Sequence, residues 1–115
     1  MTAPTIDPAT FDALKEMAGA EFAHELADTF RAEAPAMLAG LKRAYEAHDA
    51  QTFRRIAHSL KSNGSTFGAR GFAAIAKELE QGGIAPVEAA AGAPLAELDS
   101  EYARVAAALE ELKLA

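Results

Sequence analysis

The sequence predicts an all-α fold, and its composition and its apolar spacing carry that prediction. Thirty of the 115 residues are alanine and only two are valine; alanine favours helices, whereas β-branched residues favour strands. Apolar residues also recur every three or four positions along most of the chain, which is the period of one face of a helix. A chain of this length has room for one ordinary domain, so we expect a single domain over residues 1–115.

Two helices are predicted in the first half of the chain. Asp7 and Pro8 form a typical helix start, with the aspartate as N-cap and the proline in the first turn. Gly19 ends this short helix, and a longer helical pattern runs over residues 20–47. Pro35 interrupts the longer pattern. Because proline inside a helix removes one backbone hydrogen bond and clashes with the preceding turn, we expect a kink or a break there.

Three further helices are predicted, with a turn and a loop between them. A helix capped by Asp49 carries a stripe of large apolar residues: Phe53, Ile56, Leu60 and Phe67. A turn at Gly68, a helix that ends near Gly82 and a loop of small residues over 83–93 come next, and Pro94 begins the last helix. Four main helices with short connections favour an antiparallel up-down four-helix bundle, here with a short extra N-terminal helix.

Composition and charge narrow the classes of function. The formal net charge is −6, which disfavours nucleic acid as a partner, because proteins that bind the phosphate backbone carry the opposite sign. No apolar run approaches the roughly 20 residues that span a bilayer, and no signal peptide is indicated. The absence of cysteine excludes disulfides and thiol chemistry. We expect a cytoplasmic protein that binds neither nucleic acid nor membranes.

The segment 57–68 carries the most informative pattern. On a helix at about 100° per residue with His58 at zero, the large apolar residues cluster between roughly 160° and 220°. His58 therefore points to solvent, with Lys61 displaced by about 60° and one turn further along. An imidazole that is neutral near pH 7 is a competent nucleophile, and an ammonium one turn away can offset phosphate charge. The pattern fits a histidine that reacts while a partner protein is docked on it, and helix geometry alone fits an ordinary surface histidine beside a lysine equally well.

The same helix projects other residues toward that partner. The predicted partner-binding residues are Arg54, Arg55, Ser62, Gly64, Ser65, Gly68 and Ala69. Small side chains here let a partner come close, and the neighbouring helix between residues 20 and 34 is expected to add a modestly hydrophobic patch. A bulky residue at Gly64 is expected to damage transfer or helix packing, whereas alanine is expected to be tolerated.

Residues 57–68 resemble the signature of histidine-containing phosphotransfer (HPt) domains of two-component phosphorelays. In that family the helix reads Ala-His-x-Leu-Lys, followed by small residues, an apolar residue and a glycine. The matching residues here are Ala57, His58, Leu60, Lys61, Phe67 and Gly68. Ser62 stands where glycine is often found. The Ala34-Pro35 step and Leu79-Glu80 also resemble HPt domains.

The resemblance implies a phosphocarrier without kinase activity. His58 would accept a phosphoryl group through Nε2 from a receiver-domain aspartyl phosphate and pass it to another receiver aspartate, with Lys61 as charge support. The implied partners are response-regulator receiver domains and a hybrid sensor histidine kinase. The chain would need no cofactor of its own, since the receiver would supply Mg²⁺. No nucleotide-binding motif is present in the sequence.

Two alternatives remain open at this stage. One is a catalytically inert interaction module, either HPt-shaped and docking two-component proteins or a four-helix adaptor outside that family. The other is a metal site at the Glu21-x-x-His24 pair, which lacks the second such pair that di-iron bundles use, so we expect no metal. We also expect a monomer, because the apolar stripe of the last helix is needed to close the bundle; a dimer would follow if that stripe stayed uncovered.

Overall fold

A computed structural model describes residues 5–114 of the chain, with side chains described for residues 5–112. Within this part the structure is helical and contains no strand. The helices, in chain order, are α1 (Pro8–Ala18), α2 (Ala20–Glu46), α3 (Ala50–Thr66), α4 (Arg70–Gly82), α5 (Ile84–Ala89) and α6 (Ala93–Leu114). The predicted all-α class is confirmed.

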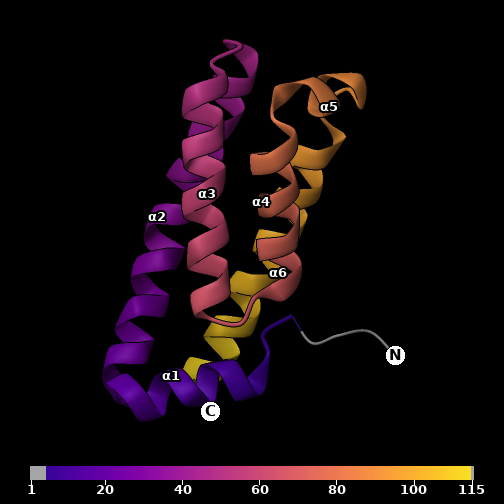
Figure 1. Ribbon diagram of the computed structural model, residues 1–115. Coiled ribbons are helices and arrows are strands. Elements are labelled where there is room, and N and C mark those ends of the chain that lie inside the picture. Colours follow the sequence, from indigo (N-terminus) through magenta and orange to yellow (C-terminus); the bar gives the residue numbers. More distant parts are fainter. Residues whose placement is uncertain (1–4, 115) are drawn as a thin grey trace.

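Four of these helices form the body of the molecule. Figure 1 shows α2, α3, α4 and α6 side by side, each running opposite to the helix before it, with α1 lying across one end of the bundle. The core contains an aromatic cluster around Phe30, whose ring centroid lies 5.6 Å from that of Phe67, 5.9 Å from that of Phe72 and 5.8 Å from that of Tyr102. This aromatic cluster joins α2 to α4, α6 and the end of α3, and thereby fixes the four helices against one another.

Helix α2 continues through Pro35 without a break. Pro35 has no N–H to bond the carbonyl of Arg31 one turn earlier. The hydroxyl of Tyr102, on α6, donates to that carbonyl at 3.1 Å. A side chain of the neighbouring helix therefore satisfies the group that proline leaves without its helical partner, and α2 remains a single helix of 27 residues.

The predicted loop over 83–93 contains the short helix α5. Its one buried side chain is Val87, which is 1% exposed. Positive φ angles at Gly83 and Gly92 turn the chain before and after it. A single buried residue produces no helical period in the sequence, which is why the pattern of small residues did not indicate this helix.

Helix α1 is fastened to the turn between α3 and α4. The backbone N–H of Asp7 donates to the carbonyl of Gly68 at 2.8 Å. The Asp7 carboxylate accepts from the hydroxyl of Thr10 at 2.6 Å and from Arg70 at 3.1 Å. The Thr10 hydrogen bond, and secondarily the charge of Arg70, lower the pKa of Asp7. This end of the bundle therefore supports the C-terminal end of the helix that carries His58.

Candidate functional site

Helix α3 places His58 on the surface of the bundle. Asp49 is the N-cap of α3, as predicted, and its side chain accepts from the backbone N–H of Thr52 at 3.2 Å. Phe53 and Leu60 are fully buried along one face of the helix. The opposite face leaves the side chain of His58 58% exposed. The predicted orientation of His58 toward solvent is confirmed.

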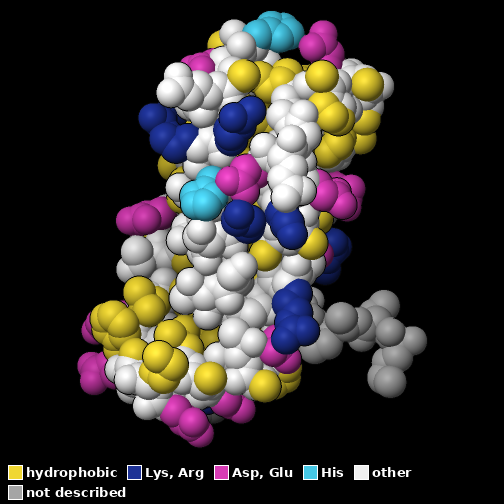
Figure 2. All heavy atoms as spheres, in the orientation of Figure 1, with side chains coloured by type: hydrophobic (Ala, Val, Ile, Leu, Met, Phe, Trp, Pro, Cys, Tyr) yellow, Lys and Arg dark blue, Asp and Glu magenta, His cyan; other side chains and the backbone are white. Residues whose placement is uncertain are grey.

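His58 belongs to a hydrogen-bonded network with Glu80 and Lys61. Nδ1 of His58 lies 2.7 Å from Oε2 of Glu80, on α4. Nζ of Lys61, one turn after the histidine on α3, donates to the other carboxylate oxygen of Glu80, also at 2.7 Å. Figure 2 shows basic side chains gathered around this part of the α3–α4 surface. Glu80 thus connects the two residues that the sequence singled out.

The charge of Glu80 decides which ring nitrogen of His58 is free. The hydrogen bond from Lys61, and to a smaller degree the one from His58, lower the pKa of Glu80 against the opposing effect of burial. An ionised carboxylate can only accept hydrogen bonds. Nδ1 of His58 must therefore carry a proton, and in the neutral ring the lone pair belongs to Nε2, the nitrogen away from Glu80. The geometry leaves the lone pair of the neutral ring on Nε2.

Sequence reasoning assigned no role to Glu80. It appeared there only within the Leu79-Glu80 step of the family resemblance. The signal in the sequence that could have indicated a role for Glu80 is its position next to the apolar Leu79. Leu79 is 4% exposed in the structure, and a carboxylate beside such a core position lies at the edge of a helix interface. Finding its partner would have required the α3–α4 pairing, which a single sequence does not supply.

Four of the seven predicted partner-binding residues lie on the exposed side of the site or at its edge. Arg54, Arg55, Ser62 and Ser65 are exposed. The two arginines, with His58, Ser59 and Glu80, line a surface hollow of about 750 Å³. This hollow is open to an approaching protein and carries a positive rim.

The other three, Gly64, Gly68 and Ala69, are buried, so their assignment to an exposed partner face is wrong. Helix α3 ends at Thr66, so the helical projection from His58 no longer applies to residues 68 and 69. Gly68 has φ +77°, and a Cβ there would lie 2.8 Å from Cβ of Thr10.

Gly64 allows α3 and α4 to approach closely. A Cβ at this position would lie 2.8 Å from Cδ1 of Phe72 and 3.4 Å from the backbone nitrogen of Ala73. Since Phe72 is completely buried, its ring has little room to move away. The expectation that alanine is tolerated at Gly64 therefore disagrees with the packing.

In the part of the chain that it describes, the structure shows no cluster of metal ligands at the Glu21-x-x-His24 pair. His24 is half-buried, with its ring centroid 6.1 Å from that of Phe11. Within the described residues no group of three His, Asp or Glu side chains could hold a metal ion. Among residues 5–114, no helix combines the length and the apolar character that crossing a membrane requires.

The fold and the site together define a small helical bundle in which the exposed His58 is oriented by the carboxylate of Glu80. Residues 25–113 match the family model of the Hpt domain. This chain belongs to that family, which acts in histidine phosphotransfer within two-component phosphorelays, and the resemblance found in the sequence is confirmed.

A solved structure supports the same assignment. The chain is similar to the crystal structure of histidine-containing phosphotransfer protein B (HptB) from Pseudomonas aeruginosa PAO1, with a TM-score of 0.86 and 31% sequence identity. The similarity covers 98% of this chain and 97% of that chain. A comparison with curated protein sequences finds no match.

Proposed function

We propose that this protein is a phosphorelay intermediate that carries the phosphoryl group on Nε2 of His58. It accepts the group from an aspartyl phosphate of one receiver domain and passes it to the aspartate of another. The observation that carries this proposal is the 2.7 Å contact between Nδ1 of His58 and Glu80, because it leaves the exposed Nε2 with the lone pair.

The transfer does not require a proton to leave the imidazole. The Nε2 lone pair attacks phosphorus, a P–N bond forms, and the P–O bond to the receiver's carboxylate breaks with the electron pair staying on that carboxylate. The ring becomes cationic because Nδ1 keeps its hydrogen. Glu80 accepts from that N–H, so its negative charge stabilises the cation as it develops. A cationic ring is also a good leaving group, which suits onward transfer to a second aspartate.

Lys61 contributes through charge. Its ammonium holds Glu80 in place through the 2.7 Å contact with Oε1, and it adds positive charge near the incoming phosphoryl group. The chain supplies no cofactor in this scheme; the receiver would hold Mg²⁺, which would provide positive charge for the transferring phosphoryl group.

The docking surface we propose spans the exposed side of α3 and the nearby corner of α1 and α2. At that corner Met17 is 87% exposed and Phe22 is 49% exposed. Figure 2 shows hydrophobic side chains gathered over this end of the molecule. An exposed apolar patch beside a charged rim is typical of protein–protein interfaces. A receiver domain would bury the patch while its aspartate meets His58.

The test is incubation of the full chain with a phosphorylated receiver domain. We expect label that is acid-labile and base-stable on the wild-type chain, and none on His58→Gln. The variant should keep an unfolding transition close to that of the wild type, since changes of exposed side chains usually alter stability by less than about 0.5 kcal/mol. ATP alone should label neither protein, as befits a carrier without kinase activity. If receivers bind the wild-type chain but never label it, the inert interaction module is correct; label on His58→Gln would refute His58 as the acceptor.

A further inference from the structure

A second, basic cleft lies beside the His58 site. It has a volume of about 330 Å³ and is formed by α3, α4 and one residue of α1. Three cationic side chains, Lys61, Arg70 and Lys77, lie around it, and its remaining lining consists of small or hydroxyl-bearing residues: Thr10, Ser65, Gly68, Ala73 and Ala74. Because Lys61 also belongs to the His58–Glu80 network, the cleft and the phosphotransfer site share a wall.

The cations of this cleft differ in how they are compensated. Lys61 is paired with Glu80 at 2.7 Å, and Arg70 with Asp7 at 3.1 Å. For Lys77, which is exposed on α4, no ion pair or hydrogen bond is found among the described residues. In a protein of net charge −6, the cleft therefore offers an uncompensated positive charge next to the reacting histidine.

The cleft and the rim of the His58 hollow form a basic strip along α3 and α4. Figure 2 shows basic side chains following one another down this face of the molecule. The strip consists of Arg54, Arg55, Lys61, Lys77 and Arg70. The exposed apolar residues Met17 and Phe22 belong to α1 and α2, whereas the strip lies along α3 and α4. A partner seated on His58 meets both.

We infer that this cleft receives an acidic side chain of the receiver domain while the receiver is docked on His58. This inference rests on the proposed function. Proteins bind Mg²⁺ through one or two carboxylates, so a receiver that holds Mg²⁺ beside its aspartate carries acidic side chains on the face that meets the strip. The small residues of the lining, Ala73 and Ala74 among them, leave space for a carboxylate to reach Lys77 and the hydroxyl of Ser65.

Such a contact at the edge of an interface acts mainly on encounter and affinity. Charges at an interface rim steer association and make it dependent on salt, whereas the chemical step depends on groups at the reacting atoms. Lys77 is therefore expected to change the receiver concentration at half-maximal transfer, with little effect on the maximal rate.

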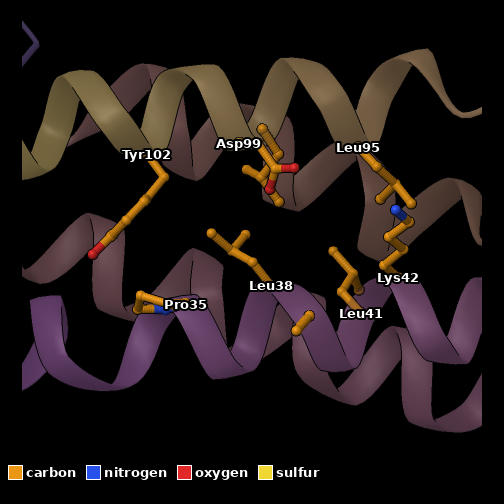
Figure 3. A pocket seen from close by; sticks show the side chains of 9 residues that line it. Pro35, Leu38, Leu41, Lys42, Leu95, Asp99 and Tyr102 are labelled. Atoms are coloured by element: carbon orange, nitrogen blue, oxygen red, sulfur yellow. The ribbon is translucent and has the colours of Figure 1, made fainter.

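The test compares Lys77→Glu with Lys42→Glu in the full chain. Lys42 is an exposed lysine on α2, at the groove between α2 and α6 that Figure 3 shows. Both variants replace a lysine with a glutamate, so they have the same net charge. Single-turnover transfer is measured against receiver concentration at low and high salt, with a phosphorylated receiver domain that labels the wild-type chain. We expect Lys77→Glu to raise the half-maximal concentration by about three- to tenfold at low salt, and the effect to shrink at high salt.

A compensating change in the receiver identifies the occupant. Exposed aspartates and glutamates around the receiver's phosphorylation site are changed to lysine one at a time. One such variant should transfer to Lys77→Glu better than the wild-type receiver does. Inorganic pyrophosphate, titrated into the wild-type chain and followed by amide chemical shifts, tests a small free anion as the occupant instead.

Two results would overturn the proposal that an acidic side chain of the receiver occupies the cleft. Equal transfer curves for Lys77→Glu and Lys42→Glu would overturn it, as would saturable pyrophosphate binding together with unchanged transfer in Lys77→Glu. The absence of any label on the wild-type chain would instead refute the proposed function, and His58→Gln provides the background in both series.

Discussion

Two interfaces of the bundle, α3–α4 and α2–α6, differ in how closely their helices approach. At α3–α4, Gly64 lies so near α4 that a single added methyl group would come within 2.8 Å of Phe72. At α2–α6, leucines and Tyr102 border a groove of about 370 Å³, which Figure 3 shows with Pro35, Leu38 and Leu95 along its sides. Figure 1 shows α6 behind α3 and α4, so the groove lies away from the His58 surface.

The difference follows from what each interface must hold. The contact between His58 and Glu80 joins two helices, and its 2.7 Å length depends on the separation of their backbones. A glycine at the closest approach fixes that separation more firmly than flexible side chains would. The α2–α6 interface holds no member of the site network, and it can be looser without disturbing the histidine.

The largest expected effect comes from filling the close interface. Gly64→Leu should destabilise the fold by about 3 kcal/mol and slow transfer, because overpacking a core typically costs about 1–3 kcal/mol and a leucine is a large addition. Gly64→Ala should cost about 1 kcal/mol, since the gain in helix propensity, also about 1 kcal/mol, only partly offsets the clash with Phe72. Urea unfolding gives both values.

Ala39→Leu is the matched control, because Ala39 lines the α2–α6 groove. It should leave stability and transfer close to wild type. Equal destabilisation by Gly64→Leu and Ala39→Leu would remove the distinction between the two interfaces.

Much of this architecture could be predicted from the sequence, and the exceptions share a cause. The helix start at Asp7, the cap at Asp49 and the exposure of His58 are local properties, set by capping and by the phase of one helix. Glu80 lies 22 positions from His58 and meets it only after α4 has packed on α3. The burial of Gly64 against Phe72 likewise depends on two helices. The properties of single helices could therefore be predicted from the sequence, whereas the contacts between helices could not.

The next effect in size concerns the carboxylate that crosses the close interface. Glu80→Gln should slow transfer by about tenfold, because a neutral amide cannot stabilise the cationic ring and can donate to Nδ1, which would place the ring proton on Nε2. Asp99→Asn, at the α2–α6 groove, is the control and should transfer at the wild-type rate. Single-turnover kinetics with a labelled receiver measure both; a Glu80→Gln rate equal to that of Asp99→Asn would show that Glu80 does not orient the histidine.

The pH dependence of stability adds an independent readout for Glu80. Its pKa in the folded chain is lowered from the ordinary value of 4.5, chiefly by the hydrogen bond from Lys61. A carboxylate with a lowered pKa contributes stability above its unfolded value and loses it as the pH falls through the folded value. The stability difference between wild type and Glu80→Gln should therefore shrink as the pH falls below the ordinary value of 4.5.

The smallest effect is expected at the looser interface. Tyr102→Phe should cost about 1 kcal/mol, because the carbonyl of Arg31 loses its 3.1 Å hydrogen bond and Pro35 cannot replace it. Burial raises the pKa of Tyr102, so its hydroxyl remains a donor throughout the neutral range. Transfer to and from receivers should stay within about twofold of wild type, since no member of the His58 network lies at this interface.

A double-mutant cycle with Pro35→Ala isolates that hydrogen bond. Alanine restores the backbone N–H that bonds the Arg31 carbonyl within α2, so Tyr102→Phe should cost less in the Pro35→Ala background, by about 0.5–1 kcal/mol. Urea unfolding of the four proteins measures the coupling. Additive free energies would show that Tyr102 stabilises α2 by packing alone. If Tyr102→Phe slowed transfer as much as Glu80→Gln does, the α2–α6 interface would control the histidine after all. The two interfaces would then not be independent.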